Sequence, residues 1–447
     1  MAIKAKKFGT FAGVFTPSLL TILGVIMYMR LGWVVGNAGL IYALVVILLA
    51  HVISLSTGLS VSSIATDKRI KAGGIYYVLS RSLGLPMGGA IGITLFVGTA
   101  LSISLYLVGF AESVLSVDPI REFLGLQQDI NGFRIIGTGA IVVLVIIAFI
   151  STSLAIKTQF YILGAIALSL VSIGVGFFVN SGYHPEGAIL AHVSNEWDPV
   201  LIFAVFFPAV TGFTAGIAMS GDLKDPKKAI PQGTMGAIAV GFIVYVGLAI
   251  GFGFFVNREL LLSDTNFLLK VAWFAPLVIA GIWGATLSSA LGGILGGPRI
   301  LQAIASDRIG PKLFAKGYGI NNEPRNALIF IFLIAEAGIL IGELNVIAEV
   351  VSMFYLASYG FINLAFYLES WASTDFRPSF RVNKYIGLIG FLAAFGVMFR
   401  LNFPAMIAAL VIVGGIYFYL KRRQLKLEYG DVWQSVWSTF MRTALQK

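Results

Sequence analysis

The chain contains no cysteine and few charged residues, and both absences narrow the classes to which it can belong. Without a thiol it can form neither a structural disulfide nor a thiolate metal site, and it has no cysteine nucleophile. Charged residues make up only 12% of its 447 residues, whereas hydrophobic residues make up 58%. No soluble domain buries that much apolar surface, so the composition indicates a polytopic membrane protein.

Motifs for enzyme chemistry and for ATP use are also missing. The three histidines, His51, His184 and His192, are scattered and suggest neither a metal site nor catalysis. No G-x-x-x-x-G-K-[ST], H-E-x-x-H or nucleophile constellation occurs in the sequence. We therefore expect a protein that is not an enzyme, has no cofactor and is not driven directly by ATP.

The net charge of +10 reflects where the basic residues lie and does not indicate nucleic-acid binding. They cluster in alternate loops and at the two ends, and only six of the 31 fall elsewhere: Arg30, Arg121, Arg134, Arg258, Lys270 and Arg400. This alternation follows the positive-inside rule and predicts cytoplasmic termini and an even number of spans. We expect an integral, multi-pass protein of the plasma (cell inner) membrane, in contact with lipids and with no nucleic-acid partner.

The hydrophobic runs predict twelve membrane spans within one transmembrane domain, residues 1–420. The spans run roughly over 11–37, 40–65, 88–115, 134–153, 158–180, 199–221, 232–256, 272–297, 327–344, 346–370, 385–400 and 404–420. Residues 68–84 predict a short interfacial helix, and residues 299–325 a second connector of that kind. The remaining 421–447 form a basic, amphipathic tail that we expect on the cytoplasmic membrane surface.

Two of the predicted spans contain helix-breaking residues at corresponding positions. Gly24 interrupts the first, and Pro208 and Gly212 interrupt the sixth. Such a pair, one in each half of a membrane protein, is the best sequence indication of a transporter's binding site. The breaks predict an inverted repeat of five plus five helices (about 11–180 and 199–370), followed by two extra helices (about 385–420). We expect the two breaks to face each other and to hold ions.

A helix break can bind ions of either sign without an ionised side chain. The first half-helix leaves carbonyl groups that suit cations, and the second leaves N–H groups that suit anions. No Asp, Glu, Lys or Arg lies within residues 15–29 or 199–221. A salt-binding site built from dipoles is consistent with this composition, whereas a proton relay through carboxylates is not.

Five stretches of the chain resemble helices of the cation-chloride cotransporters: FAGVFTPSLLTILGVIMYMRLGWVVGNAG, LYLVGFAES, FFPAVTGFTAGIAMSGDLKDPKKAIPQGT, GATLSSALGGILGGPRILQAIASDRI and ELNVIAEVVSMFYLASYGFIN. The resemblance runs from about Phe8 to about Trp437. That family belongs to the amino acid–polyamine–organocation superfamily, so the resemblance implies an all-α, LeuT-like inverted repeat. The family's large C-terminal domain and its N-terminal regulatory segment have no counterpart here, which suggests a compact, prokaryotic-type member.

The resemblance also implies a set of ion ligands, most of them backbone groups. It assigns one chloride site to Gly24, Val25 and Ile26, and a second to Gly212, Phe213 and Thr214 with the hydroxyl of Tyr359. It assigns potassium to Thr21, Ile22, Tyr106, Pro208 and Thr211, and sodium to Leu20, Leu23, Ala285, Ser288 and Ser289. Carbonyl and hydroxyl oxygens are the ligands that hard cations need. The only metal ions that we expect the protein to bind are sodium and potassium, and we expect both to bind as transported ions.

Four residues bear on the branch of the family. Ser288 and Ser289 match sodium-coupled members, and Tyr106 matches members that carry potassium, but Thr21 stands where the family usually has Asn. The resemblance thus implies electroneutral Na⁺-K⁺-2Cl⁻ symport by alternating access. A sodium-chloride symporter without potassium and a sodium-coupled amino acid transporter of the same superfamily are the alternatives.

Two further features involve charged residues inside predicted spans. Arg30 and Glu112 lie near the outer ends of spans 1 and 3, and we expect them to form an ion pair at an outer gate. Glu336 in span 9 departs from the family's usual small residue and has no obvious partner in the sequence. Whether the protein is a homodimer is left open.

Overall fold

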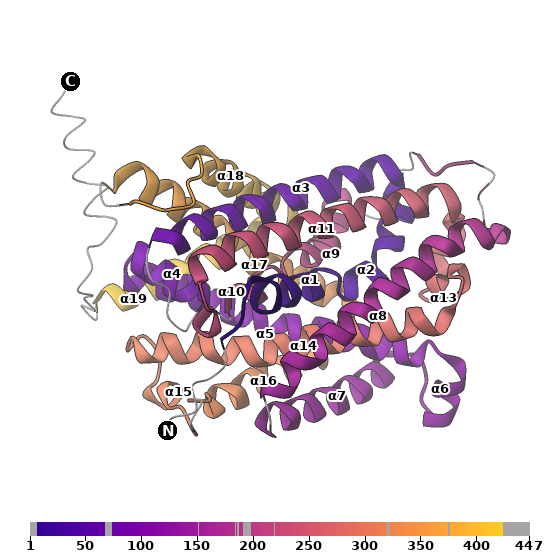
Figure 1. Ribbon diagram of the computed structural model, residues 1–447, viewed down its shortest axis with the longest axis horizontal. Coiled ribbons are helices and arrows are strands. Elements are labelled where there is room, and N and C mark those ends of the chain that lie inside the picture. Colours follow the sequence, from indigo (N-terminus) through magenta and orange to yellow (C-terminus); the bar gives the residue numbers. More distant parts are fainter. Residues whose placement is uncertain are drawn as a thin grey trace.

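The computed structural model describes residues 7–422, except 68–73, 151, 184, 186, 191–197, 219, 320–321 and 374–375. In this part of the chain the regular elements are helices, and the only β-type pairs are two isolated bridges. The long helices lie roughly along the longest axis of the molecule (Figure 1). The predicted tail at 421–447 falls almost wholly outside the described residues.

The first half of the chain forms one interrupted helix, four long helices and two short ones. In order these are η1 Phe11–Phe15, α1 Thr16–Ile22, α2 Val25–Met29, α3 Leu31–Asp67, α4 Gly74–Ser82, α5 Leu85–Leu115, α6 Asp118–Leu124, α7 Ile130–Ile150 and α8 Thr152–Val179. The α3 range contains the end of the predicted first span and the whole of the second. The two segments meet at Gly39, whose φ of 72° lies in the region that favours glycine.

The second half repeats this order. After η2 Ser181–Tyr183 come α9 Pro199–Phe206, η3 Phe207–Val210, α10 Thr214–Ala218, η4 Ser220–Asp222, α11 Pro226–Phe255, α12 Arg258–Ser263, α13 Phe267–Val271, α14 Ala275–Ser306, α15 Lys312–Ala315, α16 Arg325–Ile339 and α17 Leu344–Ala372. The chain continues with α18 Lys384–Leu401 and α19 Phe403–Arg422. Every predicted span overlaps helical residues, and both predicted breaks are present.

Two expectations about the spans need adjustment. Nine helices among the described residues are long and apolar enough to cross a membrane, so a count of twelve is not confirmed. The predicted eighth span ends at residue 297, but α14 continues to Ser306, so Arg299 lies in a helix and not in a connector. The helix continues because Ile300, Leu301 and Ile304 are buried against the protein.

Basic connectors gather at one end of the molecule. The helices α4 and α15 lie at this end, on the left of Figure 1, and α6 and α13 lie at the opposite end. We call the first the basic end, because it carries the positively charged segment between Arg299 and Arg325 and the Lys224–Lys228 loop. The positive-inside rule predicts that this end is cytoplasmic.

Polar contacts tie α4 to the end of α14 at the basic end. The Tyr76 hydroxyl donates to Oδ2 of Asp307 at 2.7 Å, and the Arg81 guanidinium contacts both carboxylate oxygens at 3.2 and 3.3 Å. Burial, followed by the nearby Asp307 carboxylate, raises the pKa of Tyr76 above its ordinary value. The phenol therefore remains a neutral donor, and these contacts hold α4, the short helix within the predicted range 68–84, against the end of α14.

Candidate functional site

The first helix is broken where the sequence places Gly24. The helix α1 ends at Ile22, and Leu23 and Gly24 leave helical geometry with φ/ψ of −81°/44° and −95°/−150°. No side chain caps the start of α2 at Val25. Carbonyls at the end of α1 and amides at the start of α2 are therefore free of regular helical pairing.

The sixth predicted span is broken in a different manner. Its α-helix ends at Phe206 and tightens into the 3₁₀ turn η3, in which Pro208 lacks a donor. Residues 211–213 are non-helical, and α10 begins at Thr214. The second break is thus a turn and a short loop, whereas the first break is confined to two residues.

The two breaks touch each other. A Cβ added at Gly212 would lie 2.6 Å from the carbonyl carbon of Thr21 and 2.8 Å from the nitrogen of Ile22, both of them backbone atoms. The hydroxyl of Ser18 also donates to the carbonyl of Phe213 at 3.0 Å. These contacts confirm the prediction that the breaks face each other, and they show why residue 212 must be glycine for this approach.

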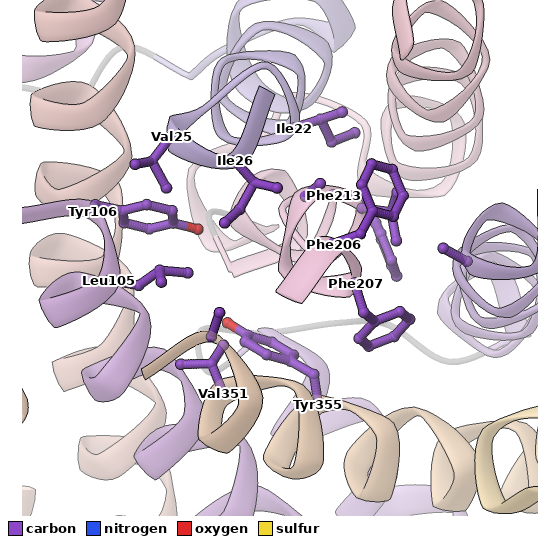
Figure 2. Close-up of a cluster of buried hydrophobic side chains, with 14 of the residues drawn as sticks. Ile22, Val25, Ile26, Leu105, Tyr106, Phe206, Phe207, Phe213, Val351 and Tyr355 are labelled. Carbon is purple, nitrogen blue, oxygen red and sulfur yellow. The ribbon is translucent and has the colours of Figure 1, made fainter. Parts of the chain in front are cut away.

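A cavity lies against the contact between the breaks. Its polar lining includes the side chains of Thr21, Tyr106, Thr214, Ser289 and Tyr355. It extends along α5 and α14 to Ile75 and Ile300, toward the basic end. In Figure 2 the hydroxyls of Tyr106 on α5 and Tyr355 on α17 point into the same space, beside Ile26 of α2. The cavity therefore extends from the breaks toward the end predicted to be cytoplasmic.

Two of the residues assigned to sodium, Leu20 on α1 and Ser289 on α14, contact each other. The Ser289 hydroxyl donates to the carbonyl of Leu20 at 3.3 Å, across 269 positions of sequence. The Ser288 hydroxyl donates to the carbonyl of Ala285 at 3.2 Å in its own helix. Both serines are buried. One hydroxyl and one carbonyl oxygen from separate helices therefore meet here, and both are neutral ligands suited to a small hard cation.

Most of the oxygens assigned to potassium already take part in hydrogen bonds within the protein. Thr21 donates to the carbonyl of Pro17 at 2.8 Å, which leaves its oxygen lone pairs facing the cavity. The Pro208 carbonyl accepts from the hydroxyl of Thr211 at 2.8 Å. The Ile22 carbonyl accepts a 2.7 Å bond from the hydroxyl of Tyr245 on α11. The sequence reasoning missed Tyr245, because nothing in its local pattern distinguishes it from a tyrosine that merely packs.

The residues assigned to the second chloride site surround a buried aromatic cluster. Tyr359 on α17 donates to the carbonyl of Thr211 at 2.7 Å, and its ring lies 5.3 Å from that of Phe213 and 5.5 Å from that of Tyr355. Tyr355 is a further lining residue that the sequence reasoning missed. Its spacing of four residues from Tyr359 could have indicated it, because residues four apart share a helix face.

Arg30 and Glu112 form the predicted ion pair. The guanidinium nitrogens lie 3.1 and 3.0 Å from the two carboxylate oxygens, and both side chains are nearly buried, at 11% and 7% exposure. A third partner was not predicted: Nε of Arg30 donates to Oδ1 of Asn345, at the start of α17, at 2.6 Å. The cluster joins the ends of α2, α5 and α17 on the side of the breaks away from the basic end.

Glu336 has a partner that its sequence context does not reveal. The hydroxyl of Thr138 on α7 donates to its Oε1 at 2.6 Å, while Oε2 is buried with no hydrogen-bond partner among the described residues. The pair lies at the contact of α7 with α16 and takes no part in lining the cavity at the breaks.

The geometry describes an integral, multi-pass membrane protein built on two broken helices that meet at its centre. The chain belongs to the amino acid permease family, whose sequence profile matches residues 13–440. A Na⁺-coupled sialic acid symporter in a substrate-bound, outward-open state shares the fold, with a TM-score of 0.53 over 91% of each chain at 11% sequence identity.

Within this family, the chain is similar to members of solute carrier family 12. It is 38% identical to member 2 from Mus musculus and 37% identical to member 2 from Homo sapiens, over 96% of its own length. Member 1 from Mus musculus is 35% identical over the same share. The chain spans only 40% of the length of the two member 2 proteins and 44% of that of member 1. The resemblance to cation-chloride cotransporters is thereby confirmed.

Proposed function

We propose that this protein is a secondary active symporter that moves chloride together with sodium and potassium. The observation that carries the proposal is the direct contact between the two breaks at Gly212 and Thr21. It brings cation-attracting carbonyls and anion-attracting amides within one small region. The similarity to solute carrier family 12 over nearly the whole chain supports the same substrate class.

The absence of ionised side chains at the breaks supplies a physical reason for coupling. A single ion bound there would place an uncompensated charge in a region of low dielectric constant, which is costly. One sodium, one potassium and two chlorides cancel one another's charge and attract one another at short range. We therefore assign electroneutral symport to the protein, with all four ions bound before the helices rearrange.

We assign the ions as the resemblance implies. Chloride takes the amides of residues 24–26 and of residues 212–214 with the Tyr359 hydroxyl, whose O–H must leave the Thr211 carbonyl to donate to the anion. Sodium takes the oxygens at Leu20, Leu23, Ala285, Ser288 and Ser289. Potassium takes the oxygens of Thr21, Ile22, Tyr106, Pro208 and Thr211. The hydroxyls that line the cavity and the Ser289 contact with Leu20 support these assignments. Thr21 offers one oxygen where Asn would offer a longer amide arm, so we expect weak potassium affinity.

The proposed transport cycle is alternating access, with the Arg30–Glu112 pair as the outer gate. Together with Asn345 this pair holds α2, α5 and α17 together beyond the breaks, while the cavity extends toward the basic end. The arrangement fits a state open toward the cytoplasm, if both termini are cytoplasmic as the charge pattern predicts. Location in the plasma membrane is part of this proposal.

Flux measurements in proteoliposomes test the proposal directly. We expect uptake of ³⁶Cl⁻ and of ⁸⁶Rb⁺ to require sodium, and uptake of ²²Na⁺ to require chloride. Omission of each ion in turn separates the full symport from sodium-chloride symport, in which uptake of ³⁶Cl⁻ does not depend on potassium or rubidium. Chloride-independent uptake of an amino acid would instead favour a sodium-coupled amino acid transporter, the function that the family's description suggests.

Tyr106→Phe tests the potassium assignment at one atom. The change removes a hydroxyl that lines the cavity and keeps the ring, which is buried in α5. We expect the rubidium concentration for half-maximal uptake to rise about 2- to 12-fold, because one neutral hydrogen-bonding oxygen contributes about 0.5–1.5 kcal/mol. Tyr42→Phe is the control, since Tyr42 lies outside the cavity and donates only a 3.4 Å bond to Pro199. Equal affinities in Tyr106→Phe and wild type would contradict the assignment.

A further inference from the structure

A second cavity forms a groove at the basic end, separate from the cavity at the breaks. It lies where α7, α14 and α16 pack against one another, near the bottom of Figure 1. Its walls include the apolar side chains of Phe149, Leu295 and Leu328. None of its lining residues lines the cavity at the breaks, so the groove is not part of the proposed transport path.

The groove lies between helices whose outer faces are apolar and exposed. On α7, Val143 and Ile146 are 56% and 52% exposed, and on α16, Ile329 and Leu333 are 51% and 56% exposed. In a membrane-spanning protein, exposed apolar faces of this kind contact the hydrocarbon chains of lipids. Acyl chains in the leaflet at the basic end can therefore reach the apolar walls of the groove.

Charged groups stand beside these apolar walls. Arg299 on α14 and Arg325 at the start of α16 line the groove, and the carboxylate of Glu323 lines it as well, so the lining carries a net charge of +1. Pro324 caps α16 without a side-chain hydrogen bond, so the positive end of that helix adds to the field. An anionic group is thus favoured at this position.

We propose that the groove binds an anionic phospholipid from the leaflet at the basic end. Arginine guanidinium groups are suited to phosphate, because they offer several donors in a planar arrangement. Basic pockets between transmembrane helices at the cytoplasmic side bind anionic lipid headgroups. The apolar walls favour a lipid over a soluble anion, because only a lipid covers Phe149, Leu295 and Leu328 while its phosphate meets the arginines.

Lipid titration of the purified full-length protein tests the site. The protein is placed in nanodiscs of phosphatidylcholine with increasing phosphatidylglycerol, and the retained phosphatidylglycerol is counted by native mass spectrometry. Arg325→Gln removes one charge from an exposed side chain, so the variant is expected to fold. We expect its affinity for phosphatidylglycerol to fall about fivefold, the effect of one basic residue near a membrane surface. Glu323→Gln removes the opposing charge and is expected to raise the affinity by a similar factor.

Arg381→Gln is the matched control. Arg381 is exposed near the start of α18, which lies on the opposite side of the molecule from α16 in Figure 1. We expect this variant to bind phosphatidylglycerol within twofold of wild type, and inorganic phosphate at the same concentration not to displace the lipid. Equal losses in Arg325→Gln and Arg381→Gln would overturn the proposal in favour of general surface charge. Displacement by phosphate would overturn it in favour of a soluble anion.

Discussion

Gly212→Ala is the substitution that most directly tests the contact between the two helix breaks. The added methyl carbon would lie 2.6 Å from the carbonyl carbon of Thr21, 2.7 Å from its Cβ and 2.8 Å from the nitrogen of Ile22. Ordinary carbon contacts are about 3.5–4.0 Å. The backbones must therefore separate by about 0.9 Å (3.5 − 2.6), and no side-chain rotation can relieve the clash with backbone atoms.

The expected magnitude follows from the cost of overpacking. Forcing an extra methyl group into a well-packed site costs about 1–3 kcal/mol. If the ion-bound state needs the breaks at their present separation, this energy is lost from ion binding. At about 1.4 kcal/mol per factor of ten, the chloride concentration for half-maximal uptake should rise about 5- to 150-fold.

The assay is chloride-dependent ⁸⁶Rb⁺ uptake in proteoliposomes, accompanied by the thermal unfolding temperature of the protein in detergent. Gly247→Ala is the matched control. It lies on α11, and a Cβ at this position would meet no atom of the described residues within 4 Å. We expect the control to transport like wild type, because the same chemical change is made there without a clash.

Two results would refute the reasoning. One is a chloride affinity and an unfolding temperature in Gly212→Ala that both equal those of wild type, which would mean that the added methyl group causes no strain between the breaks. The other is a lower unfolding temperature with unchanged affinity, which would mean that the whole fold, and not the bound state, carries the strain.

Three other predictions concern the hydrogen-bonded contacts of buried and half-buried side chains. Ser289→Ala should abolish the sodium dependence of chloride uptake, and unchanged dependence would reject the assignment. Glu112→Gln should impair transport, since a charge left unpaired in a buried pair costs about 3–5 kcal/mol. Exchanging the two residues, with Glu at position 30 and Arg at position 112, should restore part of the transport activity. If the exchange restores no activity, loss of the ion pair is not what impairs transport in Glu112→Gln. Thr138→Val should destabilise the protein by about 1–3 kcal/mol, because it leaves Oε1 of Glu336 without its hydrogen-bond donor. In unfolding measurements the double variant Thr138→Val, Glu336→Leu should be close to neutral, because both partners of the hydrogen bond are then apolar.

Local rules explain why several features could be predicted before any contact was known. Hydropathy and charge alternation depend only on neighbouring residues, so they placed the spans and indicated the basic end. Gly24, Pro208 and Gly212 act on the backbone at their own positions, so both breaks could be located. The Arg30–Glu112 pair could be inferred because charges within spans need partners.

The long-range contacts could not be predicted in the same way. Tyr245 reaches the carbonyl of Ile22 across 223 positions, and Asn345 reaches Arg30 across 315. Thr138 meets Glu336 across 198 positions. No periodic pattern connects residues so far apart. In the sequence, a Tyr, Asn or Thr that forms such a hydrogen bond also cannot be told from one that only packs or faces solvent.

The sequence by itself determined a membrane protein with two helix breaks, a charged pair near the ends of two spans and the motifs of its family. Only the tertiary structure decided that Gly212 packs against the backbone of Thr21, that Ser289 meets Leu20, and that three helices enclose a groove with two arginines. The physical reason is that helix breaking and burial are properties of short segments, whereas ligand sets depend on how separate helices approach one another.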